Sequence, residues 1–463
     1  MRPALFSAVI AVLAGACTAS AADVQPNATQ FVFPTGLAVA PDDSLLFVAN
    51  ANSELRFDSG SVLALDLALV DQLADAWTSS GQKDKDVPAT CRRDLDHTES
   101  IICDEAQFIK PNGAVRIGNF ATDIAVQDTG NGTFRLVIPV RGDPSITWVD
   151  WDGSKLACGT AQGFALCDDA HRLSAIHGDS DVGLLPQEPF NAFVDSAGQF
   201  AVVTHLTTGT VTLLDSQIGK DAEIADVGLS PFFPDQNTGL TGATGVAGRT
   251  PNMAGDTVYV GSRSESRIQM YTVGRPINNA LPFLIPGNFF FLSAVGGNAG
   301  QSSDTRGMRF SQDGSRMYLV NRDPPSLQIY DTAPGADGFP ANSLVASADI
   351  CRAASTLTVM DTGDGDRAYL TCFQDGEMYV IDPRDNATVD NIAIIGRGPY
   401  AIASAPTRKK VYVSNFLEDT VSVVDATPGS PLRNRVILRI GEPKPASETT
   451  SGTSGGTTSG SGT

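Results

Sequence analysis

The sequence predicts an all-β fold, a seven-bladed β-propeller whose blades are four-stranded antiparallel sheets. Three observations lead to this prediction. Two apolar runs joined by a short polar turn recur seven times along the chain. A further apolar run precedes each of these units, and a fourth run is visible after several of them. No segment with helical periodicity of any length interrupts the series, which disfavours an α/β fold.

The two central strands of each unit are the most regular part of the repeat. They lie at 45–66, 134–150, 200–215, 257–272, 316–331, 368–382 and 410–425. Six of the seven pairs end on Asp, and the fourth ends on Thr272. We interpret this Asp as a turn residue, because a short carboxylate accepts hydrogen bonds from turn amides where a strand ends. The six residues are Asp66, Asp150, Asp215, Asp331, Asp382 and Asp425.

The first strand of each unit begins at a small or polar residue. These strands are expected at 34–39, 121–126, 190–195, 243–248, 305–310, 355–360 and 399–404. Fourth strands are visible at 113–118, 222–228, 289–296 and 435–441. A single four-stranded sheet leaves both of its faces uncovered, so blades stacked around an axis would bury these faces against each other. The segment 278–297 is rich in apolar residues, and we interpret it as a packed outer strand rather than an interaction edge.

The strand pair resembles a known repeat. The stretches VYVSNFLEDTVSVVD (411–425) and LLFVANANSELRFDSGSVLALD (45–66) resemble the YVTN β-propeller repeat of extracytoplasmic bacterial and archaeal proteins. Its signature is a Tyr-Val-x-Asn strand followed by a Val-x-Val-Ile-Asp strand. The resemblance covers most of residues 34–441 and is strongest in the first, fifth and seventh units. It implies the architecture but no activity, because similar chains include binding modules, surface-layer components and relatives of enzymes.

The N-terminus has the layout of a secretory signal peptide, which we expect over residues 1–21. The sequence AGAC ahead of Cys17 resembles the bacterial lipobox and predicts a lipid anchor, although Ala14 stands where that motif usually has Leu. The sequence ASA, Ala19 to Ala21, is an alternative, ordinary cleavage site. We therefore expect a protein of the bacterial cell envelope, lipid-anchored in the outer membrane or periplasm, or otherwise secreted. Residues 22–33 are expected to be a linker, and residues 442–463 a disordered Ser/Thr/Gly tail.

The cysteine count supports export. Setting Cys17 aside leaves six cysteines, and an even number in an exported protein suits disulfides. Six cysteines allow 15 pairings, among which sequence proximity favours three. Two of these pairs fall in long additions after the third strand, residues 67–112 and 151–171, which we expect on one side of the propeller. The favoured pairs are Cys91 with Cys103, Cys158 with Cys167, and Cys351 with Cys372.

Composition and motifs exclude several classes of function. The net charge of −20 disfavours nucleic-acid binding and leaves a lipid anchor as the only expected membrane contact. Four histidines form no H-x-x-H motif, and neither C-x-x-C nor G-x-S-x-G occurs, so we expect no cofactor. The turn DTGDGD is a weak candidate for calcium through Asp361, Asp364 and Asp366, but its spacing departs from the EF-hand template. We interpret it as an ordinary hairpin turn, and we expect no metal site.

The remaining candidate site is the mouth of the central channel, which the first strands line. Two of the candidates follow second strands, whose ends reach the same face. The set suits a small polar ligand, or acid–base work by Asp123 and His205. We expect a monomeric, non-catalytic binding or scaffold module for a protein, glycan or small ligand, with a hydrolase or lactonase-like enzyme as the alternative. The candidates are Thr35, Thr122, Asp123, Asn191, His205, Thr244, Arg306, Arg322, Thr356 and Tyr400.

Overall fold

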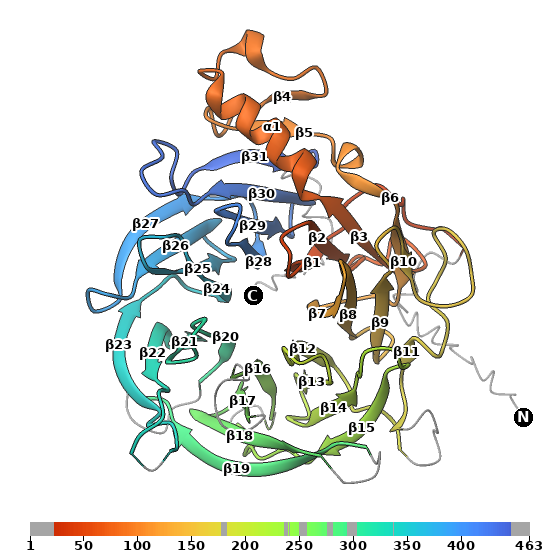
Figure 1. Ribbon diagram of the computed structural model, residues 1–463, viewed down its shortest axis with the longest axis vertical. Coiled ribbons are helices and arrows are strands. Elements are labelled where there is room, and N and C mark those ends of the chain that lie inside the picture. The colour runs from red at the N-terminus through yellow and green to blue at the C-terminus, as the bar shows by residue number, and fades with distance from the viewer. Residues whose placement is uncertain are drawn as a thin grey trace, which may run out of the picture.

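A computed structural model describes residues 23–176, 183–235, 239, 241–249, 257–275, 281–293, 303–336 and 338–445. Its strands form seven antiparallel sheets arranged around a central axis (Figure 1). Each sheet has four main strands in chain order, antiparallel to one another, with the first nearest the axis and the fourth farthest out; in blade 7 two strands of the first addition lie outside the fourth. The predicted all-β, seven-bladed propeller is therefore confirmed.

The strands follow the repeat closely. First strands are β1 (Pro34–Val39), β7 (Ala125–Gly130), β12 (Pro189–Val194), β16 (Ala243–Gly248), β20 (Thr305–Phe310), β24 (Ala354–Asp361) and β28 (Pro399–Ala405). Second strands are β2 (Leu45–Asn50), β8 (Thr133–Val140), β13 (Phe200–His205), β17 (Thr257–Ser262), β21 (Arg316–Arg322), β25 (Asp366–Cys372) and β29 (Lys410–Asn415). Third strands are β3 (Gly60–Asp66), β9 (Ser145–Trp151), β14 (Val211–Asp215), β18 (Arg267–Gly274), β22 (Pro325–Asp331), β26 (Glu377–Asp382) and β30 (Thr420–Asp425).

The outer strands vary more. They are β6 (Ile109–Ile117), β10 (Leu156–Ala157), β15 (Glu223–Gly228), β19 (Phe283–Phe291), β23 (Ser343–Asp349), β27 (Thr388–Ile394) and β31 (Val436–Ile440). The additions contribute β4 (Cys91–Arg93), β5 (Ile101–Cys103), β11 (Arg172–Leu173), the helix α1 (Leu67–Ser79) and two 3-10 turns, Asp84–Asp86 and Glu105–Gln107. In blade 2 the first strand begins later than predicted, and Ala121 makes only an isolated bridge to Val140.

Apolar side chains pack between neighbouring blades, as the uncovered faces of single sheets require. Seven of the apolar clusters in the described residues each join two adjacent blades. Between blades 1 and 2, for example, the rings of Phe47 and Phe134 meet edge to face at 6.3 Å, and both are buried. Burial between blades, rather than within one sheet, therefore stabilises the ring.

The expectation that no helical segment interrupts the strands was wrong, because α1 follows β3 directly. Asp66, which ends β3, accepts a hydrogen bond from the amide of Ala68 at 2.9 Å and so caps the helix. Along α1 the side chains of Val70, Ala74 and Trp77 are fully buried at helical spacing. The helix spans only 13 residues, which is why its buried stripe is inconspicuous in a chain dominated by strand patterns.

This first addition reaches from blade 1 to blade 7. Strand β5 pairs in parallel with β31, with Ile101 opposite Leu438, and β4 pairs with β5. Blade 7 thus becomes a six-stranded sheet, and α1, β4 and β5 lie outside β31 in Figure 1. Ion pairs of Asp71 with Arg408 and Lys410 also connect α1 with blade 7. We call α1, β4 and β5 the clasp, because they join the first and last blades.

The three favoured disulfides are those that the structure contains. Cys91–Cys103 links the two short strands of the clasp, and Cys351–Cys372 links the start of blade 6 to its second strand. Cys158–Cys167 lies in the second addition, which pairs with β9 and touches β6 through an Arg116–Leu166 bridge. Both additions lie at the outer edge of the ring, attached to different blades (Figure 1).

Strand β19 is the outer strand of blade 4, but the interpretation of its segment as packed was wrong. The side chains of Phe289 and Phe291 are 51% and 57% exposed, and Phe283 and Ile285 are also exposed. The guanidinium of Arg267 lies 4.7 Å from the ring centre of Phe289. The strand stays exposed because it lies at the perimeter, where no further strand of the described residues covers it.

The segment before β1 is well packed. Phe31, Val32 and Phe33 are buried, and the amide of Phe33 donates a hydrogen bond to Asp419 Oδ1 at 2.8 Å. This bond joins the segment to blade 7. Within the described residues, none of the helices is both long and apolar enough to cross a membrane. The expected signal peptide, Cys17 and the tail from residue 446 onward lie outside the described residues.

Candidate functional site

Most of the predicted funnel residues meet at one end of the central channel. In each blade the start of the first strand pairs with the end of the second, as Thr305 pairs with Asn321, so both reach the same end. A cavity of about 30 Å³ lies there among the first strands. The candidates that line it are Thr35, Thr122, Asp123, Asn191, Arg306, Thr356 and Tyr400.

Three of the predicted threonines hold neighbouring blades together. Thr35 Oγ1 donates a hydrogen bond to the carbonyl of Ala121 in blade 2 at 2.7 Å. Thr122 Oγ1 donates to the carbonyl of Phe190 in blade 3 at 2.5 Å. A third ring residue, Thr244, donates to the carbonyl of Thr305 in the next blade. Because these buried hydroxyls already have backbone acceptors, we assign them to ring assembly rather than to ligand binding.

His205 does not reach the channel. Its side chain is fully buried in blade 3, where Nδ1 lies 3.1 Å from the carbonyl of Gln187 and Nε2 lies 2.8 Å from Thr212 Oγ1. Burial lowers the pKa of His205 to about 4, so the imidazole is neutral at physiological pH. The expected acid–base partnership with Asp123 is therefore not formed.

Asp123 is the carboxylate at the centre of the site. Its Oδ1 accepts a hydrogen bond from the amide of Ile124 at 2.9 Å, and its Oδ2 accepts one from the amide of Ala192 at 3.1 Å. Removal from water raises the pKa of Asp123 to about 6, against the opposing charge of Arg309. Two backbone amides thus fix the carboxylate of Asp123 in place, and its pKa lies near the pH at which it could exchange a proton with a ligand.

Four arginines surround this end of the channel. Arg141, Arg263 and Arg322 stand at the ends of second strands, and Arg306 is the second residue of β20. Arg141 forms an ion pair with Glu188, and Arg306 Nη2 lies 2.8 Å from Asp304 Oδ2.

The other two arginines have no such partner. Neither Arg263 nor Arg322 forms an ion pair in the described part of the chain. Burial lowers the pKa of Arg322 and the like charge of Arg306 lowers it further, whereas the negative charge of Asp304 opposes this shift. Positive charge is therefore concentrated here without a matching number of carboxylates.

The opposite side of the same opening is aromatic. The rings of Phe373, Tyr400 and Phe416 lie 6.1 to 6.3 Å apart, and Phe416 lies 5.1 Å from Phe33. Removal from water raises the pKa of Tyr400, while the charges of Arg306, Arg141 and Arg322 oppose this rise. Tyr400 consequently lies where the aromatic and the cationic sides meet. We call the following set the polar mouth: Asp123, Arg141, Arg263, Arg306, Arg322, Tyr400, Phe373 and Phe416.

Sequence reasoning missed half of this set. Arg141, Arg263, Phe373 and Phe416 all follow second strands, as the predicted Arg322 does at the end of β21. The same signal, a large polar or aromatic residue directly after a second strand, would have found them.

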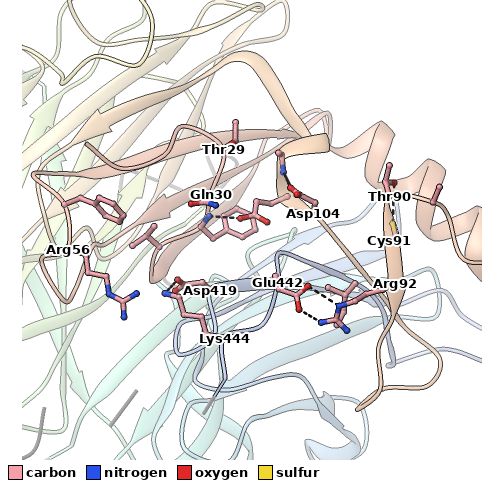
Figure 2. A pocket seen from close by; sticks show the side chains of 17 residues that line it. Thr29, Gln30, Arg56, Thr90, Cys91, Arg92, Asp104, Asp419, Glu442 and Lys444 are labelled. Carbon is pink, nitrogen blue, oxygen red and sulfur yellow. Dashed lines mark hydrogen bonds and ion pairs between the residues drawn. The ribbon is translucent and has the colours of Figure 1, made fainter. Parts of the chain in front are cut away.

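A larger cavity of about 620 Å³ lies where the clasp and the segment before β1 meet blade 7 (Figure 2). Its charged groups already have partners. Arg92 pairs with Glu442, and Lys444 pairs with Asp419, as Figure 2 shows. Glu105 accepts a hydrogen bond from the amide of Phe31 at 3.3 Å. We therefore attribute these charges to the blade junction, and the polar mouth remains the better candidate site.

The aspartates of the DTGDGD turn do not converge on a common point. Asp361 accepts hydrogen bonds from the amides of Gly363 and Gly365, and Asp366 accepts one from the hydroxyl of Tyr318 at 3.1 Å. Asp364 forms ion pairs with Arg367 and with Arg433, the latter at 2.9 Å. Across the described ranges, no group of three His, Cys, Asp or Glu side chains is arranged to hold a metal ion.

Fold and site together define a seven-bladed β-propeller with a cationic and aromatic channel mouth. No protein-family model and no curated protein matches the sequence. Solved structures with a similar fold include a protein from Lactobacillus plantarum, 14% identical, which covers 73% of this chain and 90% of its own with a TM-score of 0.52. A putative 6-phosphogluconolactonase from Bacteroides fragilis is 13% identical and covers 74% and 90%, with a TM-score of 0.53. At such identities the likeness establishes the fold alone.

Proposed function

We propose that this protein is an exported binding module whose polar mouth takes a small ligand with a carboxylate or a similar anionic group. One observation carries the proposal: Arg263 and Arg322 form no ion pair among the described residues, and Asp304, whose charge acts on Arg322, is already paired with Arg306. A half-buried guanidinium gains more from an anion than from water, and its planar fork binds a carboxylate through two hydrogen bonds.

The neighbouring aromatic rings support a ligand with a flat apolar face, such as the ring of a sugar acid. Phe373, Tyr400 and Phe416 are half-buried, so each offers part of its ring to the opening. The cavity beneath them, about 30 Å³, has room for about one water molecule. The ligand would therefore lie across the mouth, with its anionic group toward the arginines, and would not enter the channel.

We also propose where in the cell the protein is located. Three disulfides indicate an extracytoplasmic protein, because such bonds persist in oxidising compartments. We propose in addition that the N-terminal signal is cleaved ahead of Cys17 and that a lipid on this residue anchors a YVTN-like propeller to the envelope. Mass spectrometry of the mature N-terminus tests this, since a chain that begins at Ala22 or Asp23 would contradict the anchor.

A second candidate function is hydrolysis of a sugar lactone, and one observation favours it. The pKa of Asp123 is about 6, near the value that a general base needs, and Asp123 shares its cavity with Arg306 and Tyr400. The solved structures of similar fold include putative 6-phosphogluconolactonases. In this alternative Asp123 would activate water and an arginine would stabilise the carbonyl oxygen as it becomes negative.

Titration calorimetry with galacturonate and with galactose tests the binding proposal and separates it from the alternative. We expect galacturonate to bind and galactose to bind at least tenfold more weakly. The double variant Arg263→Gln/Arg322→Gln should lose most of the affinity, whereas Arg352→Gln, which changes an exposed arginine on blade 6, should retain it.

Equal binding of the two sugars would overturn the anionic selectivity. Turnover of gluconolactone that disappears in Asp123→Asn, while galacturonate affinity stays the same, would establish the enzyme instead. Absence of turnover with intact galacturonate binding would leave the binding module as the function.

A further inference from the structure

The opposite end of the central channel holds a second compartment of about 280 Å³. The later residues of the first strands line it, so their inward side chains decide its chemistry. Most of this lining is aliphatic or aromatic, and within the part of the chain that the structure describes no Asp or Glu belongs to it. The principal apolar side chains are Leu37, Val39, Ile124, Val126, Phe193 and Phe310.

Among the described residues, three polar side chains line this lower cavity, and two of them form a hydrogen bond with each other. The hydroxyls of Thr358 and Ser404 lie 2.9 Å apart. The third is Arg309, the only charged residue in the lining. A cation beside an apolar wall is stabilised by nearby anions, and Asp123 supplies one from the other side of Arg309. An anionic group of a ligand in the lower cavity would add to this stabilisation.

Arg309 lies at the waist of the channel, the point between the lower cavity and the small cavity beside the polar mouth. Together with Ala192 it lines both the lower cavity and the small cavity beside the polar mouth. Its guanidinium donates a hydrogen bond from Nη1 to the carbonyl of Met308, at 2.9 Å. It forms no ion pair within the ranges that the structure describes, although it is close enough to Asp123 to lower the pKa of that carboxyl. The remaining guanidinium donors are thus available to a ligand.

We propose that the lower cavity binds an amphiphilic monocarboxylate, such as a medium-chain fatty acid, with the carboxylate on Arg309 and the apolar chain along the first strands. The cation selects an anionic head, and the aliphatic wall selects an apolar body. The cavity on the other side of Arg309, beside the polar mouth, has a volume of about 30 Å³. This volume is too small for the ligand to extend into it, so the lower cavity is a separate site. A second ligand class therefore uses the second end of the same channel.

Titration calorimetry with octanoate, octanol and octylamine on the full chain tests this inference. We expect octanoate to bind at least tenfold more tightly than octanol, and octylamine not to bind. Shortening the chain to hexanoate removes two buried methylenes and should weaken binding about tenfold. Equal binding of octanoate and octanol, or no binding of octanoate, would overturn the proposal.

Variants locate the site. Arg309→Gln should weaken octanoate at least tenfold and leave octanol unchanged, while Arg309→Lys should retain most of the affinity. Ser404→Phe places a ring in the cavity and should exclude both ligands. Arg322→Gln, at the other end of the channel, is the matched control and should not alter octanoate binding. Unchanged octanoate affinity in both Arg309→Gln and Ser404→Phe would refute the location, and circular dichroism confirms that each variant is folded.

Discussion

Replacing Trp77 with Ala should weaken the clasp and with it the junction of blades 1 and 7. Trp77 is fully buried in α1, in one cluster with Ile101 of β5 and Leu438 of β31. Its Nε1 donates a hydrogen bond to the carbonyl of Glu99 at 2.7 Å. The side chain therefore contributes both packing and a hydrogen bond that joins the helix to the loop before β5.

The magnitude follows from these two contributions. Truncation of a buried Trp to Ala costs about 3–5 kcal/mol of unfolding free energy, because a cavity remains. Loss of the hydrogen bond to Glu99 adds about 1 kcal/mol. We therefore expect Trp77→Ala to lower the free energy of unfolding by about 4–6 kcal/mol. Leu69 lies on the same helix but is 41% exposed, so Leu69→Ala should cost about 0.5 kcal/mol or less.

Urea denaturation followed by far-ultraviolet circular dichroism measures both variants under oxidising conditions. Trp77→Phe retains most of the packing and should lie between the two. If Trp77→Ala and Leu69→Ala differ by less than about 1 kcal/mol, the clasp does not stabilise the ring, and the closure must rest on contacts between the inner strands. The contact between β1 and β28 would then be the element to test.

Three further predictions concern the core. The pKa of His205 is about 4 in the folded chain and about 6.5 in the unfolded chain, so the unfolded state binds more protons between these pH values. The melting temperature should therefore fall as the pH drops from 6.5 to 4. In His205→Gln this part of the pH dependence should vanish. Removing the Cys351–Cys372 bond by a double Ala substitution should cost about 3 kcal/mol, measured by urea denaturation, and an unchanged midpoint would show that the crosslink adds nothing. Thr244→Val leaves the carbonyl of Thr305 without its donor and should cost about 1–3 kcal/mol by the same measurement, whereas no loss would mean that this hydroxyl does not tie the blades.

The repeat predicts the ring because each blade is specified locally. An apolar strand, a turn and another apolar strand fix one hairpin, and seven such units leave faces that only neighbouring units can cover. The clasp could not be predicted in this way. Strand β5 has only three residues, Ile101–Cys103, and its partner β31 lies more than 330 residues later in the chain, near Leu438. Pairing at such a separation leaves no periodic trace in either segment.

The sequence could predict which residues lie at the candidate site, but not which groups their side chains contact. The register places Asp123, Arg306 and Tyr400 at one opening, since each lies within two residues of the start of a first strand. Sequence alone could not show that Thr35 and Thr122 bind backbone carbonyls of the next blade. Nor could it show that the imidazole of His205 faces the core, since a strand end alone does not say which way its side chain points. The direction of each side chain depends on the packing between blades. It decides whether a residue bonds to the neighbouring blade, as the threonines do, or faces the channel mouth.

The two proposed sites depend on one feature of the charge distribution. The chain has 52 acidic and 32 basic residues, yet five arginines lie at the channel and its mouth, where Asp123, Glu188 and Asp304 are the carboxylates that act on them among the described residues. Long-range repulsion from the acidic surface is screened within about 8 Å at physiological ionic strength, whereas groups inside a low-dielectric channel are screened much less. An anion that reaches either opening therefore encounters the arginines and not the net charge. The acidic surface and the cationic channel are compatible for this reason, and we expect the channel to select small anions although the net charge disfavours polyanions such as nucleic acid.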